Sequence, residues 1–262
     1  MIRGLYTSAL GMTTQMQRMD VVSNNIANVN TTGFKRDGVA AHSFSCRMGH
    51  RVDDPVANGI LRLMGNTRPV GRMSPGVFID EVFTDFVTGG FRETGNPLDI
   101  AIAGSGFFAV TVTNPDGTFQ EKFTRDGNFT IAADGTIMDM AGARLQNVDG
   151  DNIVVPSGNI IIGSDGRLLV NDEYIATIRI VDIANPTSLR KTRGNYWAVT
   201  DETELTAFNG RIEQGFLENS NVQAVREMVE LVALHRAYEA NSRMVQIHDE
   251  TLGRAVNEIA RR

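Results

Sequence analysis

Three side chains that can bind a metal ion, His42, Cys46 and His50, are spaced four residues apart. This spacing places ligands on one face only in a helix, and Gly49 together with Pro55 argues against a helix there. We therefore interpret the three as solvated loop residues and predict no metal site. Stoichiometric zinc in the purified protein would contradict this interpretation.

Five Asp-Gly dipeptides in the middle of the chain offer oxygen ligands of the kind that calcium prefers. A calcium loop needs several such ligands within about a dozen residues, and Asp149-Gly150-Asp151-Asn152 comes nearest to this. Asp-Gly also accepts the positive φ of tight hairpins, so we predict β-turns instead. Gly104-Ser105-Gly106 precedes a β-type run rather than a helix, which argues against a nucleotide loop, and no cofactor is expected. The dipeptides are Asp116-Gly117, Asp126-Gly127, Asp134-Gly135, Asp149-Gly150 and Asp165-Gly166.

The carboxylates of the middle segment do not form a catalytic pattern. An enzyme such as a peptidoglycan hydrolase would need two carboxylates in different environments, or a nucleophile beside a base. The aspartates lie in turns or on strand edges, and no Ser/His or Cys/His arrangement is suggested, so we predict that the chain is not an enzyme. A glycan-binding β domain with Tyr196 and Trp197 as a stacking platform is a further alternative, although such a pair is ordinarily buried.

Size and charge narrow the class of protein. The 262 residues, 42% hydrophobic and 21% charged, are typical of a folded chain of one or two domains. No apolar run approaches the roughly 20 residues that span a bilayer, and a cleaved secretory signal is not expected. The net charge of −6 is concentrated in residues 41–216, which sum to −7. An acidic middle between near-neutral ends argues against a nucleic-acid partner.

The N-terminal segment has the three-four spacing of a coiled-coil seam. It predicts a helix from about Ile2 to Val29, and a lone helix would need a partner to cover its apolar face. Three methionines in the seam suit a surface that fits slightly different neighbours. The seam residues are Ile2, Leu5, Ala9, Met12, Met16, Met19 and Ile26.

The C-terminal segment predicts a second, longer helix. Ser220 and Gln223 form a capping-box signature, and the helix is expected to run to about Ile259. A second stripe, formed by Val225, Val229 and Val232, gives it more apolar surface than one partner helix can cover. The predicted seam is Ala224, Met228, Leu231, His235, Tyr238, Val245, Leu252, Val256 and Ile259, with His235 packed in it.

Between the helices the pattern is β-type, so the predicted fold class is α+β. We expect residues 1–37 and 210–262 to pair as a coiled coil, residues 77–209 to form an all-β domain, and residues 38–76 to form an extended arm or long hairpin.

The segment 23–36 is rich in Asn and Thr, which are indifferent helix formers. Its simplest interpretation is a helix end that stops at Gly33. However, Asn24-Asn25-Ile26-Ala27-Asn28-Val29 and Thr32-Gly33-Phe34-Lys35 resemble the N-terminal signature of the flagellar rod and hook family of axial proteins. Residues 214–222 and 236–242 resemble its C-terminal signature, and residues 96–102 and 104–108 extend the similarity into the middle. Residues 41–74 depart most from the family pattern.

The resemblance implies a structural subunit of the bacterial flagellar basal-body rod. It implies that copies polymerise helically, with paired terminal helices lining a channel and the β domain outside, and that the polymer carries motor torque to the hook. Other rod subunits, hook subunits and the bushing rings around the rod are the implied partners. Such proteins leave the cell through the flagellar type III export apparatus without signal cleavage. The length favours a rod protein over a hook subunit, which usually has a longer middle. We predict the distal type, with a proximal-rod paralogue or a hook-type subunit as the alternative, and the choice between distal and proximal depends on residues 41–75.

By the same resemblance, polar residues near both helix ends hold the register between subunits, since each polar contact penalises sliding. These residues are Asn24, Asn25, Asn28, Asn219, Ser220, Asn221, Tyr238 and Asn241. The expected interface also contains Ile2, Leu5, Ala9, Met12, Met16, Met19, Ile26, Met228, Leu231, Val245, Leu252 and Val256.

Deletion of residues 245–262 tests this organisation. We expect the shortened chain to keep a folded β domain, measured by circular dichroism and thermal unfolding, but to lose polymerisation because part of the apolar helix surface is gone. Filaments of normal length from the shortened chain would contradict the prediction.

Overall fold

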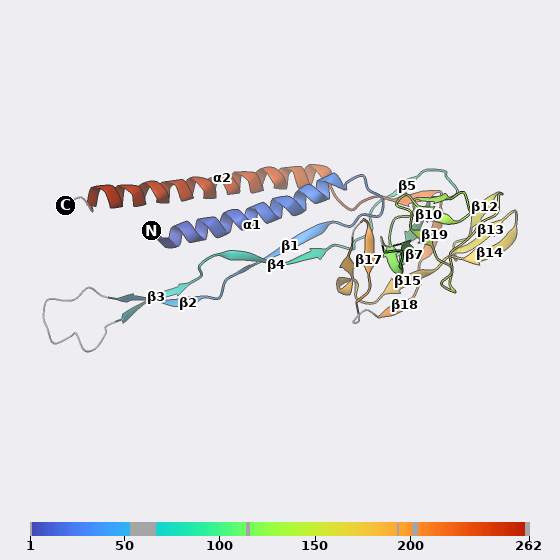
Figure 1. Cartoon of the computed structure of the whole chain (residues 1–262), viewed down its shortest axis with the longest axis horizontal. Coiled ribbons are helices and arrows are strands. Elements are labelled where there is room, and N and C mark those ends of the chain that lie inside the picture. Colours follow the sequence, from blue (N-terminus) through green and yellow to red (C-terminus); the bar gives the residue numbers. More distant parts are fainter. Residues whose placement is uncertain (1, 53–66, 114–115, 193, 201–203, 260–262) are drawn as a thin grey trace. The chain divides into compact units, whose positions relative to one another are not determined.

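The computed structural model describes residues 2–52, 67–113, 116–192, 194–200 and 204–259 (Figure 1). The chain divides into two compact units. The first contains residues 1–23, 38–83 and 225–262, and the second contains residues 24–37 and 84–224. A helix at each end and a β-rich middle confirm the predicted α+β class.

The two long helices lie side by side in the first unit (Figure 1). They are α1 (Ile2–Ala27) and α2 (Ala224–Arg254), and α2 continues as a π-helical turn, Ala255–Ile259. A Cβ atom added at Gly4 would lie 2.4 Å from Nε2 of His248, and one added at Gly11 would lie 3.1 Å from Nδ2 of Asn241. The helices are therefore antiparallel, and the two contacts lie seven residues apart on each helix.

Gly4 and Gly11 lie on the face of α1 that approaches α2, and neither belongs to the predicted seam. Glycine allows two backbones to approach closely, while a pattern search based on apolar side chains does not count it.

A third element covers another face of α1. Thr7 Oγ1 donates to the carbonyl of Pro75, and Thr14 Oγ1 donates to the carbonyl of Val77, both at 3.0 Å. Val77 begins a strand of a two-stranded ribbon, β1 (Asp37–Ser43) and β4 (Val77–Thr84). A second antiparallel pair, β2 (Arg47–Val52) and β3 (Thr67–Met73), follows in the segment that was predicted as an arm or hairpin.

The C-terminal helix begins later than its capping-box signature predicts. Ser220 Oγ accepts a hydrogen bond from the amide of Val222 at 3.2 Å, but α2 starts only at Ala224. The predicted inward position of His235 is also wrong, because its side chain is 64% exposed. Its Nδ1 lies 3.5 Å from Oε1 of Glu239 on the same helix. The residues of α2 that are buried are Glu227 and Leu234.

The second unit is built on a nine-stranded antiparallel sheet around β7 (Phe107–Thr113). This strand pairs along its length with β8 (Phe119–Thr124), from Phe108 opposite Thr124 to Thr113 opposite Phe119. The other strands of the sheet are β9 (Phe129–Ile131), β10 (Ile137–Asp139), β11 (Arg144–Leu145), β15 (Ile180–Ile183), β16 (Arg190–Lys191), β17 (Tyr196–Ala198) and β18 (Leu205–Ala207).

Three smaller sheets complete this unit, and the main core joins residues of two of them, β12–β13–β14 and β6–β19, to residues of the large sheet. Phe108 and Leu168 are fully buried at its centre, together with Ile100 and Ile102. The small sheets pair β12 (Ile160–Ile162), β13 (Arg167–Val170) and β14 (Glu173–Thr177); β6 (Ile100–Ala103) and β19 (Arg211–Gln214); and β5 (Phe91–Glu93) and β20 (Phe216–Glu218). A 3-10 turn, Pro186–Ser188, follows β15.

Four of the five Asp-Gly dipeptides act as turns, as predicted. Asp134 and Asp165 each accept a hydrogen bond from the backbone amide two residues later. The glycines of four dipeptides have positive φ: Gly117, Gly135, Gly150 and Gly166. The fifth, Gly127, is required for a different reason, because an added Cβ would lie 1.6 Å from the carbonyl oxygen of Ile100.

The core assignment can be tested with two matched leucines. Leu168→Ala removes a fully buried side chain and should lower the free energy of unfolding by about 3 kcal/mol in urea titrations. Leu205, which is 46% exposed, is the control, and Leu205→Ala should change the stability by less than about 0.5 kcal/mol. Equal losses at the two positions would contradict this core.

Candidate functional site

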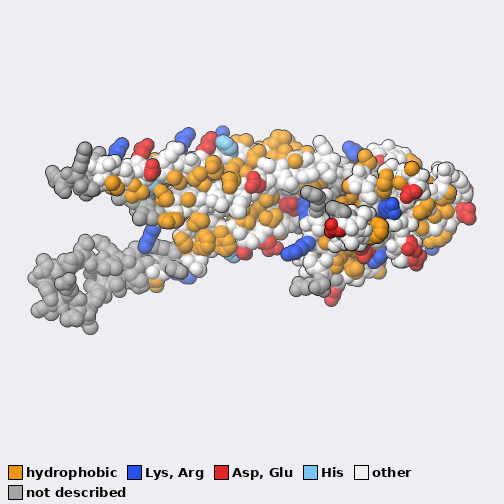
Figure 2. All heavy atoms as spheres, in the orientation of Figure 1, with side chains coloured by type: hydrophobic (Ala, Val, Ile, Leu, Met, Phe, Trp, Pro, Cys, Tyr) orange, Lys and Arg blue, Asp and Glu red, His pale blue; other side chains and the backbone are white. Residues whose placement is uncertain are grey.

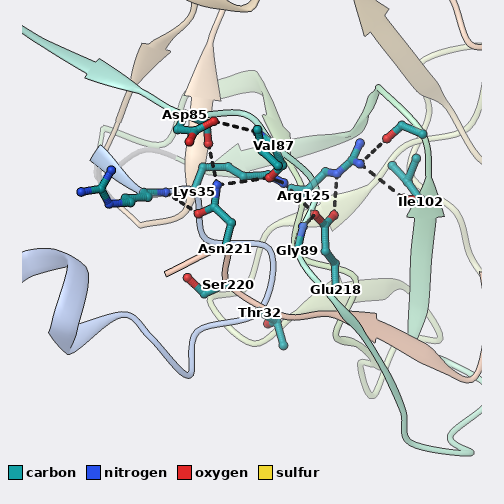
Figure 3. Close-up of polar contacts among 12 residues, drawn as sticks. Thr32, Lys35, Asp85, Val87, Gly89, Ile102, Arg125, Glu218, Ser220 and Asn221 are labelled. Carbon is teal, nitrogen blue, oxygen red and sulfur yellow. Dashed lines mark hydrogen bonds and ion pairs between the residues drawn. The ribbon is translucent and has the colours of Figure 1, made fainter. Parts of the chain in front are cut away.

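A buried group of three ionised side chains, Lys35, Arg125 and Glu218, lies in the second unit where the chain leaves α1 and approaches α2 (Figure 3). Lys35 Nζ lies 2.6 Å from Glu218 Oε1, and Arg125 Nε lies 2.7 Å from Glu218 Oε2. All three side chains are at most 4% exposed. We call this group the ionic triad.

Backbone groups satisfy the remaining hydrogen-bonding capacity of the triad. The amide of Gly89 donates to Glu218 Oε1 at 2.9 Å, and Lys35 Nζ donates to the carbonyl of Val87 at 3.0 Å. The guanidinium of Arg125 donates to the carbonyls of Ile102, Gly104 and Gly106. Burial is the main cause that lowers the pKa of Lys35 below its usual 10.5, and Glu218 opposes this shift. The geometry of the triad places the ammonium of Lys35 and the guanidinium of Arg125 on the two oxygens of one carboxylate.

The residues before Lys35 explain why Thr32 and Gly33 occur in this motif. Thr32 Oγ1 donates to Asp126 Oδ1 at 2.5 Å, and Asn195 Nδ2 donates to the carbonyl of Thr32 at 2.9 Å. Gly33 has a φ of 63°, and a Cβ there would lie 2.4 Å from the carbonyl carbon of Arg125. Its amide donates to the carbonyl of Glu218 at 2.8 Å. Gly33 is thus not the end of α1, which stops at Ala27, but the point where the backbone turns past Arg125 and Glu218.

Phe34 and Asp37 both contact the ammonium group of Lys191. Phe34 is 4% exposed, and Lys191 Nζ lies 4.1 Å from the centroid of its ring. The same ammonium lies 2.7 Å from Asp37 Oδ2. A cation placed between an aromatic face and a carboxylate stabilises both contacts. The segment from Thr32 to Asp37 is therefore fixed to the β domain at almost every residue.

Two of the motif asparagines bond to backbone within the chain. Asn25 Nδ2 donates to the carbonyl of Asp37 at 2.8 Å, and its Oδ1 accepts from the amide of Asp37 at 3.0 Å. Asn221 Oδ1 accepts from the amide of Arg36 at 2.8 Å, while its Nδ2 donates to the carbonyls of Asp85 and Val87 (Figure 3). These amides were expected to reach a neighbouring subunit, but their hydrogen bonds hold the segments next to the helices.

The other predicted interface residues differ in exposure. Ile2 belongs to α1, but its side chain is not among those that the structure describes. Asn25 is fully buried. Exposed side chains are those of Ala9, Met16, Asn24, Met228 and Val256. Partly buried side chains are those of Leu5, Met12, Met19, Ile26, Asn28, Asn219, Ser220, Asn221, Leu231, Tyr238, Asn241, Val245 and Leu252.

An apolar groove runs along the exposed face of α2. It is lined by Val225, Met228, Val229, Val232, Ala233 and Arg236. Val225 is 76% exposed and Val229 is 65% exposed, so the second stripe predicted from the sequence is uncovered in a single chain. Hydrophobic side chains are visible on the surface of the helices in Figure 2. We call this surface the α2 groove.

The alternative sites can be placed as well. His42 lies in β1 and Cys46 is exposed beyond its end, and within the described residues no three His, Cys, Asp or Glu side chains are arranged to hold a metal ion. Tyr196 and Trp197 are 6% and 1% exposed, so neither ring offers a face on which a sugar could stack. Within the described part of the chain, no helix is both long and apolar enough to cross a membrane.

Comparison with known proteins gives consistent matches along the chain. Residues 5–35 match the family model described as flagella basal body rod protein, residues 101–170 match the flagellar hook protein FlgE/F/G D1 domain, and residues 213–258 match the flagellar basal body rod FlgEFG protein C-terminal model. The ionic triad takes one residue from each of the three matches: Lys35 is the last residue of the first, Arg125 lies in the second and Glu218 lies in the third.

Individual relatives match over nearly their whole length. The flagellar basal-body rod protein FlgG of Bacillus subtilis is 33% identical over 98% of this chain and 99% of its own. FlgG of Borreliella burgdorferi is 32% identical over 98% of both chains. The flagellar basal-body rod protein FlgF of Caulobacter vibrioides is 29% identical over 100% of this chain and 99% of its own.

The burial of Asp126 predicts a pH effect, which its hydrogen bond from Thr32 opposes. Burial is the main cause that raises the pKa of Asp126 above 3.8. The folded state then binds this proton more tightly than the unfolded chain, so the contribution of Asp126 to stability is greatest below pH 3.8 and is lost as the pH rises through the folded pKa. In urea unfolding, Asp126→Asn should therefore gain stability relative to the unsubstituted protein as the pH rises.

Asp134 is the matched control for this experiment. A hydrogen bond from the amide of Thr136 is the first cause that lowers the pKa of Asp134 below 3.8, so its contribution is present above pH 3.8 and lost as the pH falls. Asp134→Asn should therefore lose stability relative to the unsubstituted protein as the pH rises, which is the opposite of Asp126→Asn. A difference between Asp126→Asn and the unsubstituted protein that does not vary with pH would contradict the assignment.

Proposed function

This chain belongs to the family of flagellar basal-body rod proteins, and we propose that its copies polymerise helically into the rod, the hollow shaft that transmits motor torque to the hook. The chain is a structural component of the flagellar basal body. The observation that carries the proposal for polymerisation is the α2 groove, an apolar helix surface that a single chain leaves in water.

The energetics favour assembly over a lone subunit. Apolar burial contributes about 25 cal/mol per Å², so a modest helix contact is worth several kcal/mol before ordering costs. The α2 groove and the exposed Met16 on α1 are available for such contacts, since Gly4 and Gly11 occupy the side of α1 that approaches α2. Flexible methionines such as Met16 and Met228 suit contacts that differ slightly between neighbours.

In this proposal the terminal helices form the inner layer of the polymer. The seven-residue repeat of the contacts at Gly4 and Gly11 supports pairing of α1 and α2 as a coiled coil within each copy. The polar residues Asn24 and Tyr238 remain candidates for holding the register between copies, whereas the side chain of Asn241 faces Gly11 of the same chain. Asn25 and Asn221 are assigned instead to the connections within the chain, where their hydrogen bonds lie.

The family also bears on partners and on the kind of rod protein. Assembly with other flagellar rod and hook subunits follows from family membership. Contacts with the bushing rings and passage through the flagellar export apparatus are proposals, as is a distal rather than a proximal place in the rod. Both FlgG and FlgF relatives match over nearly the full length. We also propose that the chain is not an enzyme, because its family is structural.

The α2 groove can be tested with one substitution. Val229→Asp places a carboxylate in the groove, and burying an unpaired charge at an interface is costly. We expect the concentration needed for polymerisation, measured by sedimentation and electron microscopy, to rise at least about tenfold. The circular dichroism of the dilute variant should not change, because Val229 is exposed in the single chain.

Val148 is the control for this test because it is 61% exposed on the β domain, outside the groove. Val148→Asp should polymerise as the unsubstituted protein does. Normal polymerisation of Val229→Asp would contradict the assignment of the groove to the interface between subunits.

A further inference from the structure

Two segments that are far apart in the sequence meet at Glu218. Residues 31–37 follow α1, and residues 216–221 precede α2. They are joined three times: Gly33 N donates to the carbonyl of Glu218, Lys35 Nζ binds its carboxylate, and Arg36 N donates to Asn221 Oδ1. The Lys35 and Glu218 positions are 183 residues apart.

A third segment, residues 85–90, is bonded to both of them. Asn221 Nδ2 donates to the carbonyls of Asp85 and Val87, and Lys35 Nζ also donates to Val87. The amide of Gly89 donates to the Glu218 carboxylate, and the amide of Asn219 donates to the carbonyl of Gly90. The side chains of Lys35, Glu218 and Asn221 thus hold all three segments together.

The charges make these contacts interdependent. If residues 31–37 leave, Glu218 keeps Arg125 but loses its second cation and one backbone partner. If residues 216–221 leave, Lys35 and Arg125 face each other in a buried site without a carboxylate. Separating one partner from a buried ion pair is far more costly than removing the pair as a whole. Each segment therefore stabilises the other beyond its own contacts with the β domain.

We propose that Glu218 couples the ordering of residues 31–37 to the ordering of residues 216–221, so that the connections to the two terminal helices become ordered together. The coupling is a property of the single chain and does not depend on polymerisation. When one of these two segments is displaced, the other segment therefore becomes less ordered, while the β core stays folded. In each subunit, residues 31–37 and residues 216–221 are then both ordered or both disordered.

Hydrogen exchange of the full-length chain, followed by mass spectrometry, tests the coupling across the sequence. In Lys35→Met we read the amides of residues 216–221, and in Glu218→Gln we read those of residues 31–37. We expect exchange in the segment that carries no substitution to become faster by on the order of 100-fold, because a buried ion pair has been broken. Amides of β7 should keep their protection.

The control breaks a comparable ion pair at the surface. Arg167 and Asp165 pair at 3.0 Å, but their side chains are 67% and 54% exposed, so Arg167→Gln should change exchange in neither segment. Lys35→Met leaves Glu218 paired with Arg125, so this variant decides the question if Glu218→Gln does not fold. Faster exchange confined to the substituted segment would overturn the proposal. An equal acceleration in β7 would also overturn it, since that indicates global unfolding.

Discussion

The burial of the Glu218 carboxylate is the constraint on which the rest of this structure depends. A carboxylate that is 1% exposed must be surrounded by donors, and here they come from Lys35, Arg125 and the amide of Gly89. This requirement fixes the path of the chain after α1, because Gly33 has to pass the carbonyl of Arg125 at a distance that excludes a side chain. The burial of this carboxylate therefore explains why Gly33, Lys35 and Glu218 occur in the motifs of the two termini.

The helices divide their surfaces between two tasks. Small residues, Gly4 and Gly11, occupy the side of α1 that approaches α2, and threonines bind the ribbon of β1 and β4. The larger apolar side chains Met16, Met228 and Val229 are left outside. Since helix stability in water depends on covering apolar faces, this arrangement supports the proposal that copies of the chain cover one another's helices.

Periodicity and turn chemistry predicted the elements but not how they contact each other. The three-four repeat located both helices within a few residues, and Asp-Gly located the turns, because each signal is local. Gly4 and Gly11 were absent from the predicted seam of α1, since glycine contributes no hydrophobicity where closeness of approach decides the contact. The ionic triad had no detectable signal, because Arg125 lies 93 residues from Glu218 and outside every motif. Asn25 and Asn221 were recognised as special residues, but the prediction that they bond between subunits did not anticipate backbone partners in the same chain.

The ribbon of β1 and β4 has a consequence for handling the protein. It is a sheet of only two strands within the described residues, and each strand of such a sheet has an edge at which another strand can pair. Asn25 and Thr14 bind these edges at Asp37 and Val77, where the two strands begin. Exposed Val82 and Phe83 add hydrophobic surface beside one of these edges. Aggregates of concentrated samples should therefore be checked for intermolecular β-structure, for instance by infrared spectroscopy, before they are taken for native filaments.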